Sequence, residues 1–235
     1  VSFEQAILQA VEAEYQRYRA LPLAERVSGD TTAGHTLAYC LAIEEAFGIE
    51  VPEPARVLRA VALELERLYN HVAAIGALAN DVGYGIVQAH ALRIREALLR
   101  INDDVCGHRL LRGMVVPGGA RAARLPSRDQ LAAVDADVRE VVDLALGHTV
   151  VRERFTGTAV LTGEQARDIG VLGYVARASG VDIDARRMHP FLDLGDGLHP
   201  AVQSGGDVLA RFLVRATEFH HSVGLLRQLL GRVEA

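Results

Sequence analysis

A long amphipathic stretch from about Pro54 to Asn80 constrains the fold of this chain more than any other feature. Apolar side chains recur in it at three- and four-residue spacing, which is the period of one helix face. At a rise of about 1.5 Å per residue, such a helix is about 40 Å long. The apolar face consists of Val57, Val61, Leu65, Leu68, Val72 and Ile75. The stretch therefore predicts a long helix with one buried side.

Similar periodicity predicts further helices over 2–19, 33–47, 86–112, 128–147 and 207–231, and a shorter helix interrupted by glycines over 164–178. Met114 to Gly119 predicts a short strand with a glycine turn, and residues 155–161 predict a second small strand. The glycine- and proline-rich residues 189–206 are expected to form a loop. We therefore expect a mainly α fold, a helical bundle with a few short strands that forms one domain over residues 1–235.

The composition argues against several classes of function. The 235 residues are 50% hydrophobic and carry a formal net charge of −5, which disfavours a nucleic-acid-binding or polybasic membrane surface. No apolar run of about eighteen residues and no signal peptide is visible, so we expect no membrane span. Cys40 and Cys106 are the only cysteines, as expected for packing thiols in a reducing compartment. The chain starts at Val1, which leaves open that it is a fragment of a longer subunit.

The sequence also lacks the motifs of several enzyme classes. Its nine histidines form no HxxxH, HExxH or Cys/His cluster, which argues against a zinc site. His220 and His221 adjoin each other and point to different sides of a helix, so they make a poor metal pair. Neither G-x-G-x-x-G nor a Walker A motif occurs, and we expect this chain to bind no nucleotide. Ser28 and Ser204 lack the G-x-S-x-G frame of a nucleophile elbow.

The segment from Arg26 to His35 is a turn of small and hydroxyl-bearing residues that runs into the helix predicted over 33–47. Thr31 or Thr32 is expected to cap that helix, because a hydroxyl at its start can accept a hydrogen bond from a free amide. A glycine-containing turn before a buried helix brings the backbone close to a ligand and aims several amides at one point. The turn is therefore our first candidate site.

This turn resembles the one in the large subunit of group 4 membrane-bound nickel–iron hydrogenases and in its relative, the 49 kDa (D) subunit of respiratory complex I. The hydrogenase turn reads Arg-[Ile/Val]-Cys-Gly-x-Cys-x-x-x-His, and its two cysteines hold the nickel. Arg26, Gly29 and His35 match it, but Ser28 and Thr31 occupy the cysteine positions. An alcohol is neither soft nor readily deprotonated, so these two cannot replace thiolates on nickel. The tyrosine that faces the quinone in complex I falls on Gly29.

Further motifs of the same family follow in the same order along the chain. They are the run from Glu64 to His71, Asp81-Val82-Gly83, Arg95-Glu96 with Gly107 and Arg109, Gly118-Gly119, the run from Leu161 through Arg177 and Asp184 to Arg186, and Gly206-Asp207 with Arg211, Arg215, Glu218 and Ser222. The resemblance covers roughly Leu23 to Leu230 and implies a hydrogenase large-subunit-like helical bundle.

Several of these residues have both a structural and a functional interpretation. Glu64 and Arg67 share a helix face and are expected to form a salt-bridged flank that registers neighbouring helices. For His71, a hydrogen-bonded packing residue and a site residue both stay open. Asp81 is either a site residue without its partner or, as we prefer, a helix-end or turn residue, because the histidine-bearing hairpin that its family counterpart pairs with has no equivalent in this chain.

The resemblance implies a subunit of a membrane-associated oxidoreductase complex of NADH:quinone oxidoreductase or hydrogenase type. Such a chain would bind no cofactor or metal itself and would shape a cavity beside the 4Fe–4S cluster of a partner, with quinone as an optional ligand. Its partners would be an iron–sulfur small subunit and membrane subunits, in the cytoplasm at the periphery of the inner membrane. The degenerate active-site turn consists of Arg26, Ser28, Gly29, Thr31 and His35. The candidate cavity-lining residues are Glu64, His71, Asp81, Arg211, Arg215 and Glu218.

This hypothesis predicts a deep groove around Ser28, Gly29, His35, Asp81, Arg211 and Arg215. Two other functions stay open. The chain could be a catalytically silent structural or assembly module of the same fold and a homo-oligomer in isolation, because without cofactor ligands it cannot move electrons by itself. It could also bind nickel through His35, His71 and Asp81. We expect the isolated chain to be inactive as an oxidoreductase.

Overall fold

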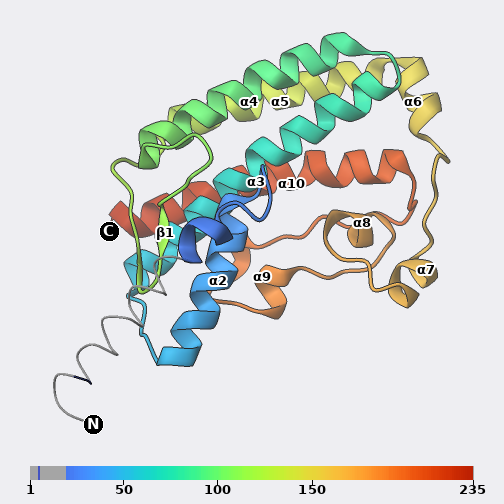
Figure 1. Ribbon diagram of the computed structural model, residues 1–235. Coiled ribbons are helices and arrows are strands. Elements are labelled where there is room, and N and C mark those ends of the chain that lie inside the picture. Colours follow the sequence, from blue (N-terminus) through green and yellow to red (C-terminus); the bar gives the residue numbers. More distant parts are fainter. Residues whose placement is uncertain (1–4, 6–19, 235) are drawn as a thin grey trace.

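The computed structural model describes residue 5 and residues 20–234, most of which are helical (Figure 1). The helix predicted over 2–19 lies, apart from Gln5, outside the described residues. The helices are α2 (Thr32–Phe47), α3 (Glu53–Asp81), α4 (Gly85–Cys106), α5 (Arg128–Gly147), α6 (Thr149–Phe155), α7 (Gly163–Asp168), α8 (Gly173–Ala178), α9 (Ala185–Met188) and α10 (Val208–Glu234), with a 3-10 turn, η1, at Gly195–Gly197. The mainly α prediction is confirmed.

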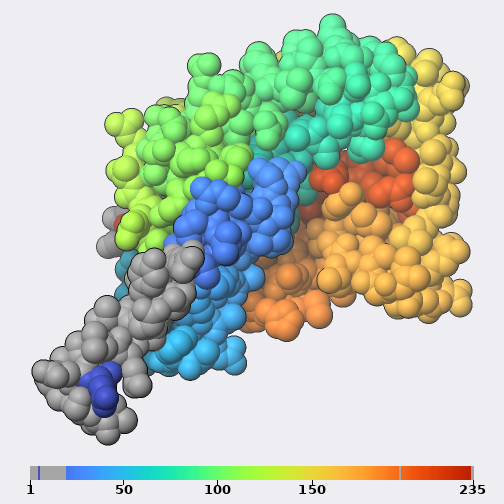
Figure 2. Space-filling view, viewed as in Figure 1, coloured from blue at the N-terminus to red at the C-terminus, as the bar shows by residue number. Residues whose placement is uncertain are grey.

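The two longest helices, α3 and α10, cross in the middle of the bundle (Figure 1). Helices α4 and α5 lie side by side and cover one side of this pair. Helix α2 and the short helices α8 and α9 lie on the other side. In Figure 2 the blue α2 and the orange α8–α9 segment lie side by side on the face in view. The candidate site lies where these elements meet α3 and α10.

The apolar stripe of α3 forms the centre of the core, as its spacing predicts. Its members Val57, Val61, Leu65, Leu68, Val72 and Ile75 are all buried. Gly76 lets α4 approach closely, because a Cβ at this position would lie 2.6 Å from the Cβ of Ala91. A small residue at this crossing therefore sets the distance between the two helices.

A buried ion pair ties the predicted strand region to the bundle. Strands β1 (Val115–Val116) and β2 (Gly119–Ala120) form an antiparallel hairpin in which Val115 pairs with Ala120. The fully buried Arg59 of α3 donates from Nε to the Gly119 carbonyl (3.0 Å) and from Nη2 to the Val116 carbonyl (2.7 Å), and it pairs with Glu44 of α2. The guanidinium thus joins α2, α3 and the hairpin.

Two expectations are wrong, the strand at 155–161 and the end of the helix over 86–112, and backbone geometry explains both. Residues 155–161 form no strand: Phe155 ends α6 and is buried against Phe212, and the chain then turns through positive φ at Gly157 and Ala159. Helix α4 ends at Cys106 because Gly107 has a φ of +77°. The helix over 164–178 is interrupted by glycines, as expected: α7 and α8 are separated at Gly170 and Gly173, which both have a φ of +67°. Glycine adopts such angles at little cost.

Within the described part of the chain, no helix combines the length and the apolar character that crossing a membrane requires.

Candidate functional site

The turn before α2 holds a small cluster of oxygen atoms. The Ser28 hydroxyl donates to Oδ1 of Asp30 over 2.8 Å, and the Thr31 hydroxyl lies 3.2 Å from both Ser28 Oγ and Asp30 Oδ1. The hydrogen bond from Ser28 helps to hold the pKa of Asp30 below its usual value. Ser28 and Thr31, at the two cysteine positions of the hydrogenase motif, are thus neighbours in space as well.

The cap of α2 differs from the expectation. Thr31 occupies the N-cap position but makes no side-chain cap, since its hydroxyl belongs to the cluster around Asp30, and the Thr32 hydroxyl lies near the Glu25 carbonyl. Glu66 of α3 caps the helix in place of a threonine and accepts hydrogen bonds from the amides of Ala33 (2.6 Å) and Gly34 (2.9 Å). Burial raises the pKa of Glu66, although these amides oppose the shift. A carboxylate at a helix N-terminus also benefits from the helix dipole.

The turn is fixed to α3 by hydrogen bonds as well as by this cap. The carbonyl oxygen of Asp30 accepts from the Tyr69 hydroxyl at 2.7 Å and from Nδ2 of Asn70 at 3.0 Å. Tyr69 is fully buried, and the Arg95 guanidinium lies 5.7 Å from the centre of its ring. The glutamate, tyrosine and asparagine of one α3 turn therefore position the turn whose sequence resembles the nickel-binding segment of the hydrogenases.

The residues of the turn do not fit a nickel ion. Ser28 and Thr31 present hydroxyl groups that are engaged with Asp30 and with each other, whereas nickel in this motif needs thiolates. His35 is exposed on α2. Across the described residues, no group of three or more histidine, cysteine, aspartate or glutamate side chains is arranged to hold a metal ion. The chemistry of the turn is that of neutral hydroxyls beside one carboxylate.

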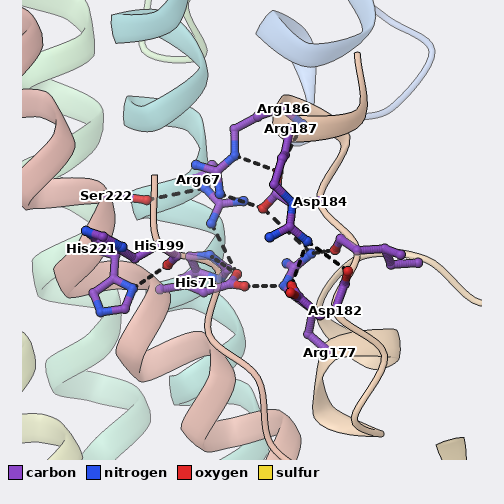
Figure 3. A network of polar contacts seen from close by, with 12 residues as sticks. Arg67, His71, Arg177, Asp182, Asp184, Arg186, Arg187, His199, His221 and Ser222 are labelled. Carbon is purple, nitrogen blue, oxygen red and sulfur yellow. Dashed lines mark hydrogen bonds and ion pairs between the residues drawn. The ribbon is translucent and has the colours of Figure 1, made fainter. Parts of the chain in front are cut away.

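A buried network of charges connects α3, α10 and the α8–α9 segment (Figure 3). Glu218 of α10 is its centre. One carboxylate oxygen accepts from Arg177 Nε at 2.5 Å, and the other lies 3.1 Å from Arg67 Nη2. Although burial opposes it, the contact with the His71 ring and the two arginines hold the pKa of Glu218 well below its usual range. Glu218 is therefore ionised and links α3, α8 and α10.

The network continues into the loop before α9. Arg186 donates to both oxygens of Asp184 (2.9 and 2.7 Å) and to Oε1 of Glu64 (2.7 Å). Burial opposes it, but Arg186 keeps the pKa of Asp184 below its usual value. Glu64 also lies 3.4 Å from Nε of Arg67, which in turn donates to Ser222 Oγ of α10. The expected salt-bridged flank of Glu64 and Arg67 is confirmed.

A cavity of about 520 Å³ opens between α2, α3 and the α8–α9 segment. Its wall is mostly aliphatic, and three arginines of the charge network, together with Asp184, reach it. The principal lining residues are Gly34, Leu37, Ala38, Leu41, Leu63, Arg67, Leu172, Arg177, Ile183, Asp184, Arg186, Met188, His189 and Phe191. The cavity thus extends from the N-terminal end of α2 to the charge network around Glu218.

The residues expected around a groove lie elsewhere. None of Ser28, Gly29, His35, Asp81, Arg211 and Arg215 lines this cavity, and their role in a site stays a prediction. Asp81 is exposed at the end of α3. Arg211 donates to the backbone carbonyls of Gly206 and Ala159. The guanidinium of Arg215 lies 3.5 Å from the centre of the Tyr174 ring, where a cation–π contact joins α10 to α8.

The sequence motifs contained three further network residues that were not assigned to a site. Arg177, Asp184 and Arg186 belong to the glycine-rich family run that ends at Arg186, so that run was the available signal. They occupy the network because α8 and α9 pack against α10 and α3. The spacing of residues within the run does not show which carboxylates on the long helices they reach.

Acidification is expected to destabilise the protein through His71, whose two ring nitrogens are buried without a hydrogen-bond partner. Nε2 lies 3.3 Å from Oε2 of Glu218, but not in hydrogen-bonding geometry. Burial lowers the pKa of His71 from 6.5 to about 4. The unfolded chain therefore takes up the proton first, so stability is complete above the unfolded pKa and is lost as the pH falls toward the folded one.

Between about pH 7 and about pH 5 this loss amounts to about 2 kcal/mol. Urea unfolding at the two pH values measures it. The His71→Gln variant is expected to lose less stability than the wild type over this interval, by that amount, while His90→Gln at an exposed position of α4 behaves like the wild type. Equal losses in the wild type and in His71→Gln would contradict this assignment.

Comparisons with known proteins place these features in a family. Residues 81–235 match the family model described as "Respiratory-chain NADH dehydrogenase, 49 Kd subunit". The D-subunit of NADH-quinone oxidoreductase from Geotalea uraniireducens (strain Rf4) is 34% identical over 236 residues, which cover 94% of this chain and 59% of the relative. Formate hydrogenlyase subunit 5 of Escherichia coli (strain K12) is 32% identical over 212 residues, which cover 87% of this chain and 37% of the relative.

A solved structure gives the same result for the fold. A chain of the membrane-bound sulfane sulfur reductase, described as an archaeal respiratory membrane complex, superposes with a TM-score of 0.83 at 26% identity. The match covers 92% of this chain and 60% of the other. The fold predicted from the motifs is therefore confirmed. The chain spans less than two thirds of the length of each of these relatives.

Proposed function

Because this chain belongs to the family of the 49 kDa subunit of the respiratory-chain NADH dehydrogenase, we propose that it is a subunit of a membrane-associated oxidoreductase complex. The complex would be of NADH:quinone oxidoreductase or hydrogenase type. The relatives carry both kinds of name, since one belongs to an NADH-quinone oxidoreductase and another to a formate hydrogenlyase. Its electrons would pass through an iron–sulfur cluster of a partner subunit, because its own turn has no ligand set for a metal.

The observation that carries this proposal is the turn from Ser28 to Thr31. The segment is fixed to α3 through Glu66 and Tyr69, and the two residues that the motif aligns with the cysteines, Ser28 and Thr31, carry hydroxyl groups. A preserved frame without a metal site fits a subunit that shapes the surroundings of a partner's cluster. The partners would be an iron–sulfur small subunit and membrane subunits, which would hold the chain at the cytoplasmic periphery of the inner membrane. Quinone is the acceptor that the family favours.

The second candidate is a catalytically silent assembly module of the same fold. Gly29 favours it, since this position bears the quinone-facing tyrosine in complex I and here offers no side chain. In this case the buried network around Glu218 would serve only to fix α3, α8 and α10 to one another. The two candidates differ in whether an electron acceptor is reduced by the complex that contains this chain.

Purification from native membranes with a tag on this protein tests the proposal. We expect an iron–sulfur subunit and membrane subunits to co-purify, and the complex to reduce a short-chain quinone when a low-potential donor is supplied. A complex with these partners but no quinone reduction would support the silent module. A homo-oligomer without a redox partner would contradict the proposed function.

A further inference from the structure

The cavity between α2 and the α8–α9 segment has the properties of a small-molecule site that the turn before α2 does not share. Its volume of about 520 Å³ lies within the range of about 300–1,000 Å³ that is typical of ligand pockets. Leu37, Leu41, Leu63, Ile183 and Phe191 supply an apolar wall from three separate segments. Pockets of this kind combine such a wall with a few polar groups that fix the orientation of a ligand.

The polar groups here are guanidinium donors with unused capacity. Arg67 and Arg177 both line the cavity and flank the carboxylate of Glu218. Arg67 uses Nε and Nη2, and Arg177 uses Nε and Nη1, for partners within the described residues. No described residue accepts a hydrogen bond from Nη1 of Arg67 or from Nη2 of Arg177. Neither nitrogen is one of the fully buried polar atoms that lack a hydrogen-bond partner. Both remain open to a ligand.

The carboxylates around the cavity already accept hydrogen bonds from arginines, so the polar groups that are available to a ligand are donors. Glu218 and Asp184 accept from arginines, and Glu64 accepts from Arg186 through Oε1, while its Oε2 is enclosed. Glu66 accepts hydrogen bonds from two amides at the start of α2. The three arginines of the network, Arg67, Arg177 and Arg186, balance its three carboxylates. Two of these carboxylates, Glu64 and Glu218, do not line the cavity, so its wall presents three guanidinium groups and one carboxylate, Asp184. This excess of positive groups at the wall favours a negatively charged ligand.

We propose that this cavity binds a small monocarboxylate with an apolar body, whose carboxylate contacts Arg67 and Arg177 and whose body lies along α2. A guanidinium binds a carboxylate through charge-assisted hydrogen bonds, which are stronger than those to a neutral oxygen. The exposed Leu172 and Met188 at the cavity would cover the apolar end. This inference does not rest on the redox function and would hold for a silent module as well.

Calorimetric titration with decanoate, and with the neutral decanol as its matched probe, tests the proposal on the full protein together with any subunits that accompany it. We expect decanoate to bind one molecule per chain, and decanol to bind at least about tenfold more weakly, since a charge-assisted contact is worth about 1.5–3 kcal/mol. Equal affinities, or no binding of decanoate, would overturn the proposal.

Variants on α2 locate the ligand without touching the charge network. Ala38 is exposed and lines the cavity, so Ala38→Phe is expected to fill it and to weaken decanoate binding at least about tenfold. Ala42 is exposed one turn later on the same helix and does not line the cavity, so Ala42→Phe is expected to bind like the wild type. Unchanged binding in Ala38→Phe, with melting temperatures matched, would place decanoate elsewhere and overturn the site.

Discussion

Replacing Glu218 by leucine is expected to lower the free energy of unfolding by about 3–5 kcal/mol, because breaking a buried ion pair from one side leaves the other charges buried and uncompensated. The side chain of Glu218 is 1% exposed, and its carboxylate contacts Arg67 and His71 of α3 and Arg177 of α8. Without it, two guanidinium groups would face each other across an apolar gap. Urea unfolding at neutral pH measures the loss.

A second carboxylate supplies the control for this substitution. Glu96 of α4 pairs with Arg109 and Arg100, but 40% of its side chain is exposed to solvent. Exposed ion pairs contribute little to stability, so Glu96→Leu is expected to leave the unfolding midpoint almost unchanged. If Glu218→Leu were as mild as Glu96→Leu, the network would not hold α8 and α9 against the long helices.

Gly206→Ala is expected to destabilise the protein by about 3 kcal/mol or more, since it adds a steric clash to a disfavoured backbone conformation. Gly206 has a φ of +63°, and a Cβ at this position would lie 2.1 Å from the carbonyl oxygen of Leu161. The amide of Gly206 donates a hydrogen bond to the carbonyl of Ala178, and its carbonyl accepts hydrogen bonds from the amide of Leu161 and from Arg211. No small shift can relieve the clash, because three segments are fixed around it.

Gly224→Ala is the matched control. Gly224 lies within α10, and a Cβ there would meet no atom within 4 Å. Alanine in a helix interior is favoured over glycine by about 0.5–1 kcal/mol, so this variant is expected to gain stability. Thermal unfolding of the two variants compares them directly. Similar melting temperatures would show that Gly206 is not confined as the structure indicates.

The long helices were predictable because each has a continuous apolar face. The stripe from Val57 to Ile75 repeats at the helical period and is buried throughout, and the capping box of Ser127 with Gln130 accompanies the predicted start of α5. The segment at 155–161 was not predictable in this way. Some of its apolar residues are exposed to solvent, and the exposed fraction of Val160 is 52%. The apolar content of this segment therefore did not indicate which of its residues are buried.

Some residues of the charge network could be predicted from the sequence, but their connections could not. Family motifs identified Glu64, Arg67 and Glu218, and these are members of the network. The cap of α2 by Glu66 was missed, because a carboxylate more than thirty positions away replaced the adjacent threonine hydroxyl. Such contacts depend on how helices cross, which periodicity within one helix does not specify.

Elemental analysis of the complex purified through this protein tests the central claim most directly. The claim is that the chain keeps the helical frame of a redox subunit while hydroxyl groups stand where nickel would need sulfur. We predict iron and acid-labile sulfide from a partner's cluster, and nickel well below one atom per chain. Nickel at one atom per chain, or a complex without any iron, would contradict it.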